Sequence, residues 1–126
     1  EDHVFKILGL HWAGMKKETK VAAEALLELQ HKDGGWAQMA KMKSDAYATG
    51  QALTVLKQSG ILKSDSTQYK RGVAWLLENQ KPDGSWHVKT HSKPIQKYFE
   101  SDFPHGKDQF ISISATCWAV MALLPK

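Results

Sequence analysis

Residues 26–36 read LLELQHKDGGW, and residues 76–86, fifty positions further on, read LLENQKPDGSW. Seven of the eleven positions are identical, and they include the Gln that opens each turn and the Trp that closes it. A phrase that returns at a fixed offset with this much identity indicates a repeat architecture. We therefore predict two equivalent helix–turn units, not two unrelated helix ends of similar composition.

Length, charge and composition limit the class of protein and the partners that can be expected. The 126 residues are 42% hydrophobic and 24% charged, which fits one globular domain with a sizeable core. The net charge of +4 is mild, and no basic run with interleaved aromatic residues occurs, so a nucleic-acid partner is not expected. No apolar stretch has the length of a membrane span, no signal peptide is present, and the single Cys117 cannot form an internal disulfide. These features do not assign a cellular compartment.

Apolar residues recur with helical spacing in five segments, and no segment alternates with the period of a strand. The predicted helices cover residues 2–13, 18–30, 45–58, 66–80 and 110–124. The last of them is apolar nearly all round, which is typical of a helix enclosed by other protein. We expect an all-α fold in which residues 1–126 form one helical-repeat domain. The second predicted helix carries one apolar stripe, made of Val21, Ala22, Ala25, Leu26 and Leu29.

A second phrase, Ala-Thr-x-x-Ala-x-x-x-Leu, occurs in two of the predicted helices. It begins at Ala48 and again at Ala115, an offset of 67 residues instead of 50. Seventeen extra residues therefore lie between the second turn and the helix that follows it. Because Ala at positions i and i+4 lets helices approach closely, we expect these two helices to be inner and the amphipathic ones to be outer.

The repeated turn has a physical logic that needs no ligand. Asp-Gly favours a left-handed turn, Gln can bind backbone groups left open at helix ends, and Trp adds a large apolar surface. We therefore interpret four residues as a structural clasp between helices and not as a binding site: Gln30, Trp36, Gln80 and Trp86.

These turns resemble the QW motifs of the squalene–hopene cyclase and protein prenyltransferase family of α/α toroids. The second turn has the longer form, with Arg71-Gly72 and Trp75-Leu76 ahead of Gln80, whereas the first is degenerate there. The resemblance implies two concentric layers of helices and a cavity lined by the starts of the inner helices. Only about two and a half repeats are present, so we expect an arc of a toroid. The absence of an initial Met also leads us to expect a piece of a longer chain, with the arc near the C-terminus of that protein.

The chemistry of that family does not transfer to these residues. Its cyclases protonate an alkene with the central Asp of a DxDD motif, but the matching stretch here keeps only Asp45, with Tyr47 and Ala48 in the other acidic places. A tyrosine, with an ordinary pKa near 10, cannot replace a strong carboxylic acid. Its prenyltransferases hold zinc with Asp, Cys and His, and Cys117 has no carboxylate at that spacing. The resemblance therefore implies no cofactor, no metal and no identified catalytic residue for this chain.

The long connection at residues 87–109 is the remaining candidate for function, because connections of this length are usually functional or disordered. Three interpretations stay open: a packed surface loop with solvated histidines, a loop that contacts ligand, and a metal site built on the i, i+4 pair His87 and His91. We expect its apolar residues to be buried, namely Val88, Ile95, Tyr98, Phe99 and Phe103. Together with the start of the inner helix, the predicted ligand-binding residues are Asp45, Tyr47, His91, His105 and Asp108.

Two functions from different classes follow. The first is a terpenoid-cyclase-like module that binds an apolar small molecule in a cavity completed by missing repeats or by another chain. The second is a non-enzymatic scaffold whose inner-helix face binds protein. In either case an open arc predicts self-association, or packing against the remainder of a longer chain.

Overall fold

The computed structural model describes residues 1–125 of the chain. These residues form five α-helices and one short 3-10 helix, with no strand in the described range. Each α-helix begins and ends within two residues of its predicted position, so the all-α fold class is confirmed. The elements are α1 (Asp2–Trp12), α2 (Lys16–Glu28), α3 (Ala46–Gln58), α4 (Thr67–Glu78), η1 (Gly106–Asp108) and α5 (Gln109–Leu123).

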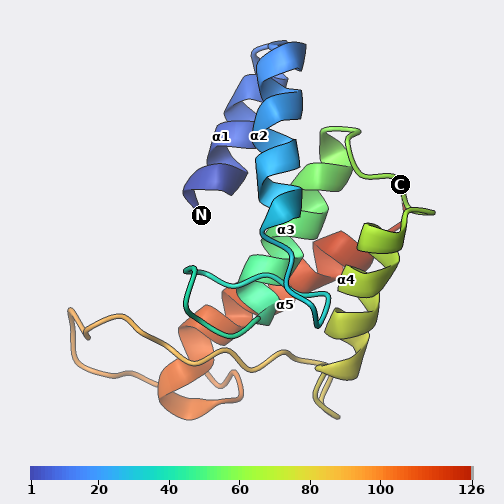
Figure 1. Cartoon of the computed structure of the whole chain (residues 1–126). Coiled ribbons are helices and arrows are strands. Elements are labelled where there is room, and N and C mark those ends of the chain that lie inside the picture. The colour runs from blue at the N-terminus through green and yellow to red at the C-terminus, as the bar shows by residue number, and fades with distance from the viewer. Residues whose placement is uncertain (126) are drawn as a thin grey trace.

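Helices α3 and α5 form the centre of the molecule. They pack along each other more extensively than any other pair of helices (Figure 1). Helix α4 lies beside them, and the α1–α2 hairpin projects away from this group, with α1 in contact with α3. Because α3 lies between α1, α4 and α5, it is buried along nearly its whole length. None of the helices in residues 1–125 combines the length and the hydropathy needed to cross a membrane.

Small residues and one buried lysine join the two central helices. Gly50 of α3 lies so close to α5 that a Cβ atom there would lie 2.7 Å from the backbone nitrogen of Ala119. At the other end, the Lys57 Nζ donates to the carbonyls of Ala122 and Leu124 at 3.0 and 2.7 Å. These carbonyls have no helical partner, so the lysine satisfies them and places a cation at the negative end of the α5 dipole.

Both turn tryptophans are buried in the same way. Trp36 and Trp86 are 2% and 1% exposed. The Trp36 Nε1 donates to the Leu26 carbonyl at 2.8 Å, and the Trp86 Nε1 donates to the Leu76 carbonyl at 2.7 Å. Because the two pairs are related by the fifty-residue offset, the predicted repeat of helix and turn is confirmed.

The Gln of each turn closes the turn itself. The Gln30 Nε2 donates to the Gly34 carbonyl at 2.8 Å, and the Gln80 Nε2 donates to the Gly84 carbonyl at 2.9 Å. Both glycines have left-handed backbone, with φ of 96° and 85°, which glycine adopts without strain. The Gln30 Nε2 also donates to the Gln68 carbonyl at 2.9 Å, so the first turn binds the first turn of α4.

Two predicted apolar faces are less buried than expected. Helix α5 packs its small residues against α3 but leaves Phe110, Val120 and Met121 exposed, at 45%, 44% and 39%. Full enclosure of this helix is therefore wrong within the described residues. In the predicted stripe, Val21 and Leu29 are 67% and 48% exposed and Ala25 is also exposed, so the prediction is wrong at these three positions. The residues that α2 does bury are Thr19, Ala22, Ala23 and Leu26.

The segment before α5 has little regular secondary structure and lies on the surface. Val88 is buried, as expected, but every residue from 91 to 100 is exposed. The prediction of burial is therefore wrong for Ile95, Tyr98 and Phe99, because no described element covers this part of the segment. The Phe99 ring lies against the ring of Phe110, with ring centroids 5.0 Å apart.

Candidate functional site

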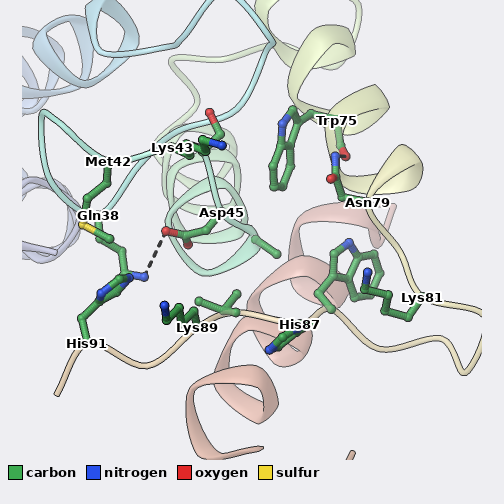
Figure 2. A pocket seen from close by; sticks show the side chains of 14 residues that line it. Gln38, Met42, Lys43, Asp45, Trp75, Asn79, Lys81, His87, Lys89 and His91 are labelled. Carbon is green, nitrogen blue, oxygen red and sulfur yellow. Dashed lines mark hydrogen bonds between the residues drawn. The ribbon is translucent and has the colours of Figure 1, made fainter. Parts of the chain in front are cut away.

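A pocket of about 410 Å³ opens where α3 begins (Figure 2). Its walls come from the segment before α3, from the last turn of α4, from the second QW turn and from the first residues of the long segment that follows. The apolar part of the lining is Met42, Ala46, Trp75, Trp86 and Val88, and the polar part is Gln38, Lys43, Ser44, Asp45, Asn79, Lys81, His87, Lys89 and His91. The pocket therefore joins an apolar surface to many polar groups.

Asp45 stands at the edge of this pocket as the N-cap of α3. Its Oδ1 accepts a hydrogen bond from the Ala48 backbone N–H at 2.9 Å, and its Oδ2 accepts from the Gln38 Nε2 at 3.0 Å. An Asp in this position satisfies an N–H that has no helical partner, and it complements the helix dipole. Both carboxylate oxygens are therefore already engaged, and Asp45 has a structural role at the rim.

A cluster of polar side chains joins the second QW turn to the start of α5. The His87 Nε2 lies 2.8 Å from the Asp108 Oδ2, and the rings of His87 and His105 stack with their centroids 4.7 Å apart. The His105 Nε2 lies 2.7 Å from the Ser85 Oγ, which donates to the Asp83 Oδ1 at 2.6 Å. We refer to Asp83, Ser85, His87, His105 and Asp108 as the histidine cluster. Since it ties the far end of the long segment back to the turn, it sets the path of that segment.

The environment of the histidine cluster lowers the pKa values of three of its members, and for Asp83 the main cause is the hydrogen bond from the Ser85 hydroxyl. Burial alone raises the pKa of Asp108, but the hydrogen bonds from His87 and from the Thr90 N–H outweigh burial, and the pKa falls below its usual value of 3.8. Burial and then the nearby His87 hold the pKa of His105 below its usual 6.5. Asp108 is therefore ionised and His105 neutral near pH 7. In this state His105 is a hydrogen-bonding group within the fold.

At the first QW turn, a serine is bonded to an aspartate and a histidine, as in the histidine cluster. The Ser44 Oγ donates to the Asp33 Oδ1 at 2.9 Å and lies 3.0 Å from the His31 Nδ1. The other Asp33 oxygen accepts from the Trp75 Nε1 at 3.2 Å, and the Arg71 guanidinium donates to the His31 carbonyl at 2.9 Å. The first turn is thus bonded to α4, and this contact positions Trp75 at the pocket.

The predicted ligand-binding residues divide among three places. Asp45 and His91 line the pocket at the start of α3. His105 and Asp108 belong to the histidine cluster, which meets the pocket only through His87. Tyr47 lies away from both, with its hydroxyl donating to the Glu1 carboxylate; burial and then this hydrogen bond raise its pKa to about 12.

A second pocket, of about 440 Å³, lies on the side of the molecule where Glu1 is found. Its lining includes the end of α2, the first turn tryptophan Trp36 and the buried Gln51 of α3. The Gln51 Nε2 has no hydrogen-bond partner among the described residues. This pocket contains none of the five predicted ligand-binding residues.

Sequence reasoning missed several residues of the first pocket. Lys43, Lys81 and Lys89 are far apart in the chain, so their common position gave no local signal. The i, i+4 spacing pairs His87 with His91 in the metal-site interpretation, whereas its partner in the structure is Asp108. Within residues 1–125, no three His, Cys, Asp or Glu side chains lie close enough together to hold a metal ion.

Comparison with protein families gives one finding. The family model for the squalene-hopene cyclase C-terminal domain matches residues 7–105, which is more than three quarters of the chain. The matched range includes both QW turns and most of the pocket-lining segments. Comparison with curated proteins and with solved structures gives no significant match.

Proposed function

Since the chain belongs to the squalene-hopene cyclase C-terminal domain family, we propose that it binds an apolar small molecule in a cavity that further repeats or another chain complete. The observation that carries this proposal is the pocket at the start of α3. Its apolar surface lies beside a polar rim, which is the usual layout of a small-molecule site.

Helix α5 supports the idea of a cavity that other protein completes. It is apolar on both faces, but only the face with its small residues packs against α3. Phe110, Val120 and Met121 on its other surfaces are substantially exposed. An apolar ligand, or a further helix beside α5, would remove this surface from water, which is favourable by about 25 cal/mol per Å² of apolar area.

The proposal assigns binding to this chain, without alkene protonation by the residues described. Asp45 is the carboxylate at the start of α3, and both of its oxygens already accept hydrogen bonds. Tyr47, the second residue of α3, has a pKa of about 12. Neither group supplies the strong acid that protonation of an alkene requires.

Tryptophan fluorescence tests the proposal directly, because Trp75 lines the pocket and Trp12 does not. The 126-residue chain is titrated with squalene delivered from cyclodextrin, alongside Trp75→Phe and the matched control Trp12→Phe. We expect a saturable change in emission in the wild-type chain and in Trp12→Phe, and a much smaller change in Trp75→Phe. Thermal melts of both variants check that the fold is kept. An equal change in all three proteins, or no saturable change in any, contradicts binding at this pocket.

A scaffold role is the second candidate, and one observation favours it. The α1–α2 hairpin exposes Phe5, Trp12 and Val21 at 55%, 76% and 67%. Exposed apolar residues grouped on one part of a small protein often mark a protein-binding surface. In this alternative, a second protein covers the hairpin, and the pocket at the start of α3 has no ligand.

A further inference from the structure

The lining of the pocket at the start of α3 carries more positive than negative charge. Lys43, Lys81 and Lys89 all line it, and Asp45 is the single carboxylate among the lining residues. With the histidines counted as neutral, three lysines and one aspartate give the lining a formal charge of +2. A concave surface with one sign of charge concentrates ligands of the opposite sign.

These lysines approach the pocket from three separate segments. Lys43 lies before α3, Lys81 lies in the second QW turn, and Lys89 lies three residues beyond Trp86 (Figure 2). Within residues 1–125, none of the three forms an ion pair with a carboxylate. The nearby Asp45 is already held by the α3 backbone and by Gln38. The ammonium groups therefore remain available to a ligand.

The apolar part of the same pocket limits what that ligand can be. The Trp75 ring, half-buried, is held in place by its bond to Asp33, and Trp86 is fixed by its bond to the Leu76 carbonyl. Since Trp86 is only 1% exposed, the Trp75 ring supplies the accessible aromatic surface beside the lysines. A small inorganic anion would use the charges but leave this surface in water, whereas an apolar molecule without charge would leave the lysines unpaired.

We propose that the pocket at the start of α3 binds an amphiphile: an anionic headgroup, phosphate or carboxylate, among Lys43, Lys81 and Lys89, and an apolar body against Trp75. Lysine is a common phosphate-binding residue and acts as a point charge, which suits a headgroup contacted from several sides. This inference rests on the proposed function, and it adds the chemical class of the ligand.

Titration with ligands of one chain length isolates the headgroup. Decyl phosphate, decanoate, decanol and inorganic phosphate are each titrated, below their aggregation limits, into the 126-residue chain at low and high salt. Because exposed charge pairs each contribute modestly and three act together, we expect decyl phosphate or decanoate to bind roughly ten-fold more tightly than decanol at low salt. Salt should reduce this difference, since the lysines are exposed. The affinities of decyl phosphate and decanoate, compared with each other, identify the preferred headgroup.

A matched pair of triple variants locates the effect. Lys43→Gln, Lys81→Gln and Lys89→Gln together should remove the advantage of the charged ligands and leave decanol binding unchanged. The control replaces three exposed lysines of α1 and α2 by Gln, namely Lys6, Lys16 and Lys17. It changes the net charge by the same amount and should bind every ligand as the wild type does.

The outcomes separate the two proposals. Equal binding of decanol and the charged ligands overturns the headgroup inference but leaves apolar binding intact. Failure of every decyl compound to bind overturns the proposed function as well. If inorganic phosphate binds as tightly as decyl phosphate, or if the control variant loses as much affinity as the pocket variant, the amphiphile site does not exist.

Discussion

Two threonines attach the turn tryptophans to the central helices. The Trp36 backbone N–H donates to the Thr49 Oγ1 at 2.9 Å, and the Trp86 backbone N–H donates to the Thr116 Oγ1 at 3.1 Å. The tryptophans are 50 residues apart and the threonines 67, yet the contact is the same. The seventeen extra residues therefore leave this contact unchanged, and they add only the loop that carries the histidine cluster. The QW turn and the Ala-Thr phrase are two separate repeats in the sequence. In the structure they form one contact, because each turn tryptophan binds the threonine of the helix that follows it.

The lowered pKa of His105 makes the stability of the fold depend on pH. Its folded pKa lies below 6.5, so between that lowered value and 6.5 the unfolded chain binds more protons than the folded one. Stability is then greatest above pH 6.5 and falls as the pH drops through this window. Asp108 acts in a separate range, because its lowered pKa affects stability only below about pH 3.8.

We therefore expect His105→Asn to flatten the loss of stability between pH 7 and 5. Asn tolerates the left-handed backbone of this residue, with φ of 86°. Urea unfolding at several pH values measures the effect. His11→Gln is the control, since it removes an exposed imidazole that has no hydrogen-bond or ion-pair partner among the described residues. If His105→Asn loses as much stability between pH 7 and 5 as the wild type, then His105 is not the group responsible for the pH dependence.

At the scale of helices, most of the fold follows from sequence. The period of the apolar residues predicts where the helices lie, and in the structure the side chains of Asp45 and Ser66 cap α3 and α4 by accepting backbone hydrogen bonds. Which face of a helix is covered was harder to predict. Val21 and Leu29 have helical spacing but face solvent, because α2 packs mainly on α1 through its smaller residues. Periodicity gives the apolar face, whereas the partner decides which part of it is buried.

Two glycines in different helices give opposite predictions for the same substitution. A Cβ on Gly50 would lie 2.7 Å from backbone atoms of α5, so Gly50→Ala should push α3 and α5 apart and destabilise by about 1–3 kcal/mol. Gly9 of α1 has nothing within 4 Å of the added carbon, so Gly9→Ala should stabilise by up to about 1 kcal/mol through helix propensity. Chemical denaturation measures both. Stabilisation by Gly50→Ala would show that the central helices are not in close contact.

At the scale of the whole molecule, the candidate site was only partly predictable. Asp45 and His91 were expected near a ligand, and they line one pocket. The lysines were not expected there, since Lys43, Lys81 and Lys89 line one pocket only because the second QW turn lies near the start of α3. The path of the long segment was also unpredictable, because it depends on ring stacking between His87 and His105, eighteen residues apart. Local sequence patterns do not report such contacts.

The apolar surfaces left exposed on α1 and on α5, the first and the last helix of the chain, predict self-association. Trp12 on α1 is 76% exposed, and Phe110 and Val120 on α5 are 45% and 44% exposed. Stacked helical repeats need their ends covered, so an arc with open ends should associate through one of these helices. We expect the average mass of the chain to rise above 14.1 kDa as concentration increases in sedimentation equilibrium.

Val120→Glu or Trp12→Glu should weaken this association about ten-fold or more if the altered helix lies at the interface. Met39→Glu, at an exposed loop residue, is the control and should have no effect. A constant mass of one chain at every concentration would show that the open ends do not drive association, and it would also weaken the scaffold alternative, which relies on the same exposed residues of the α1–α2 hairpin.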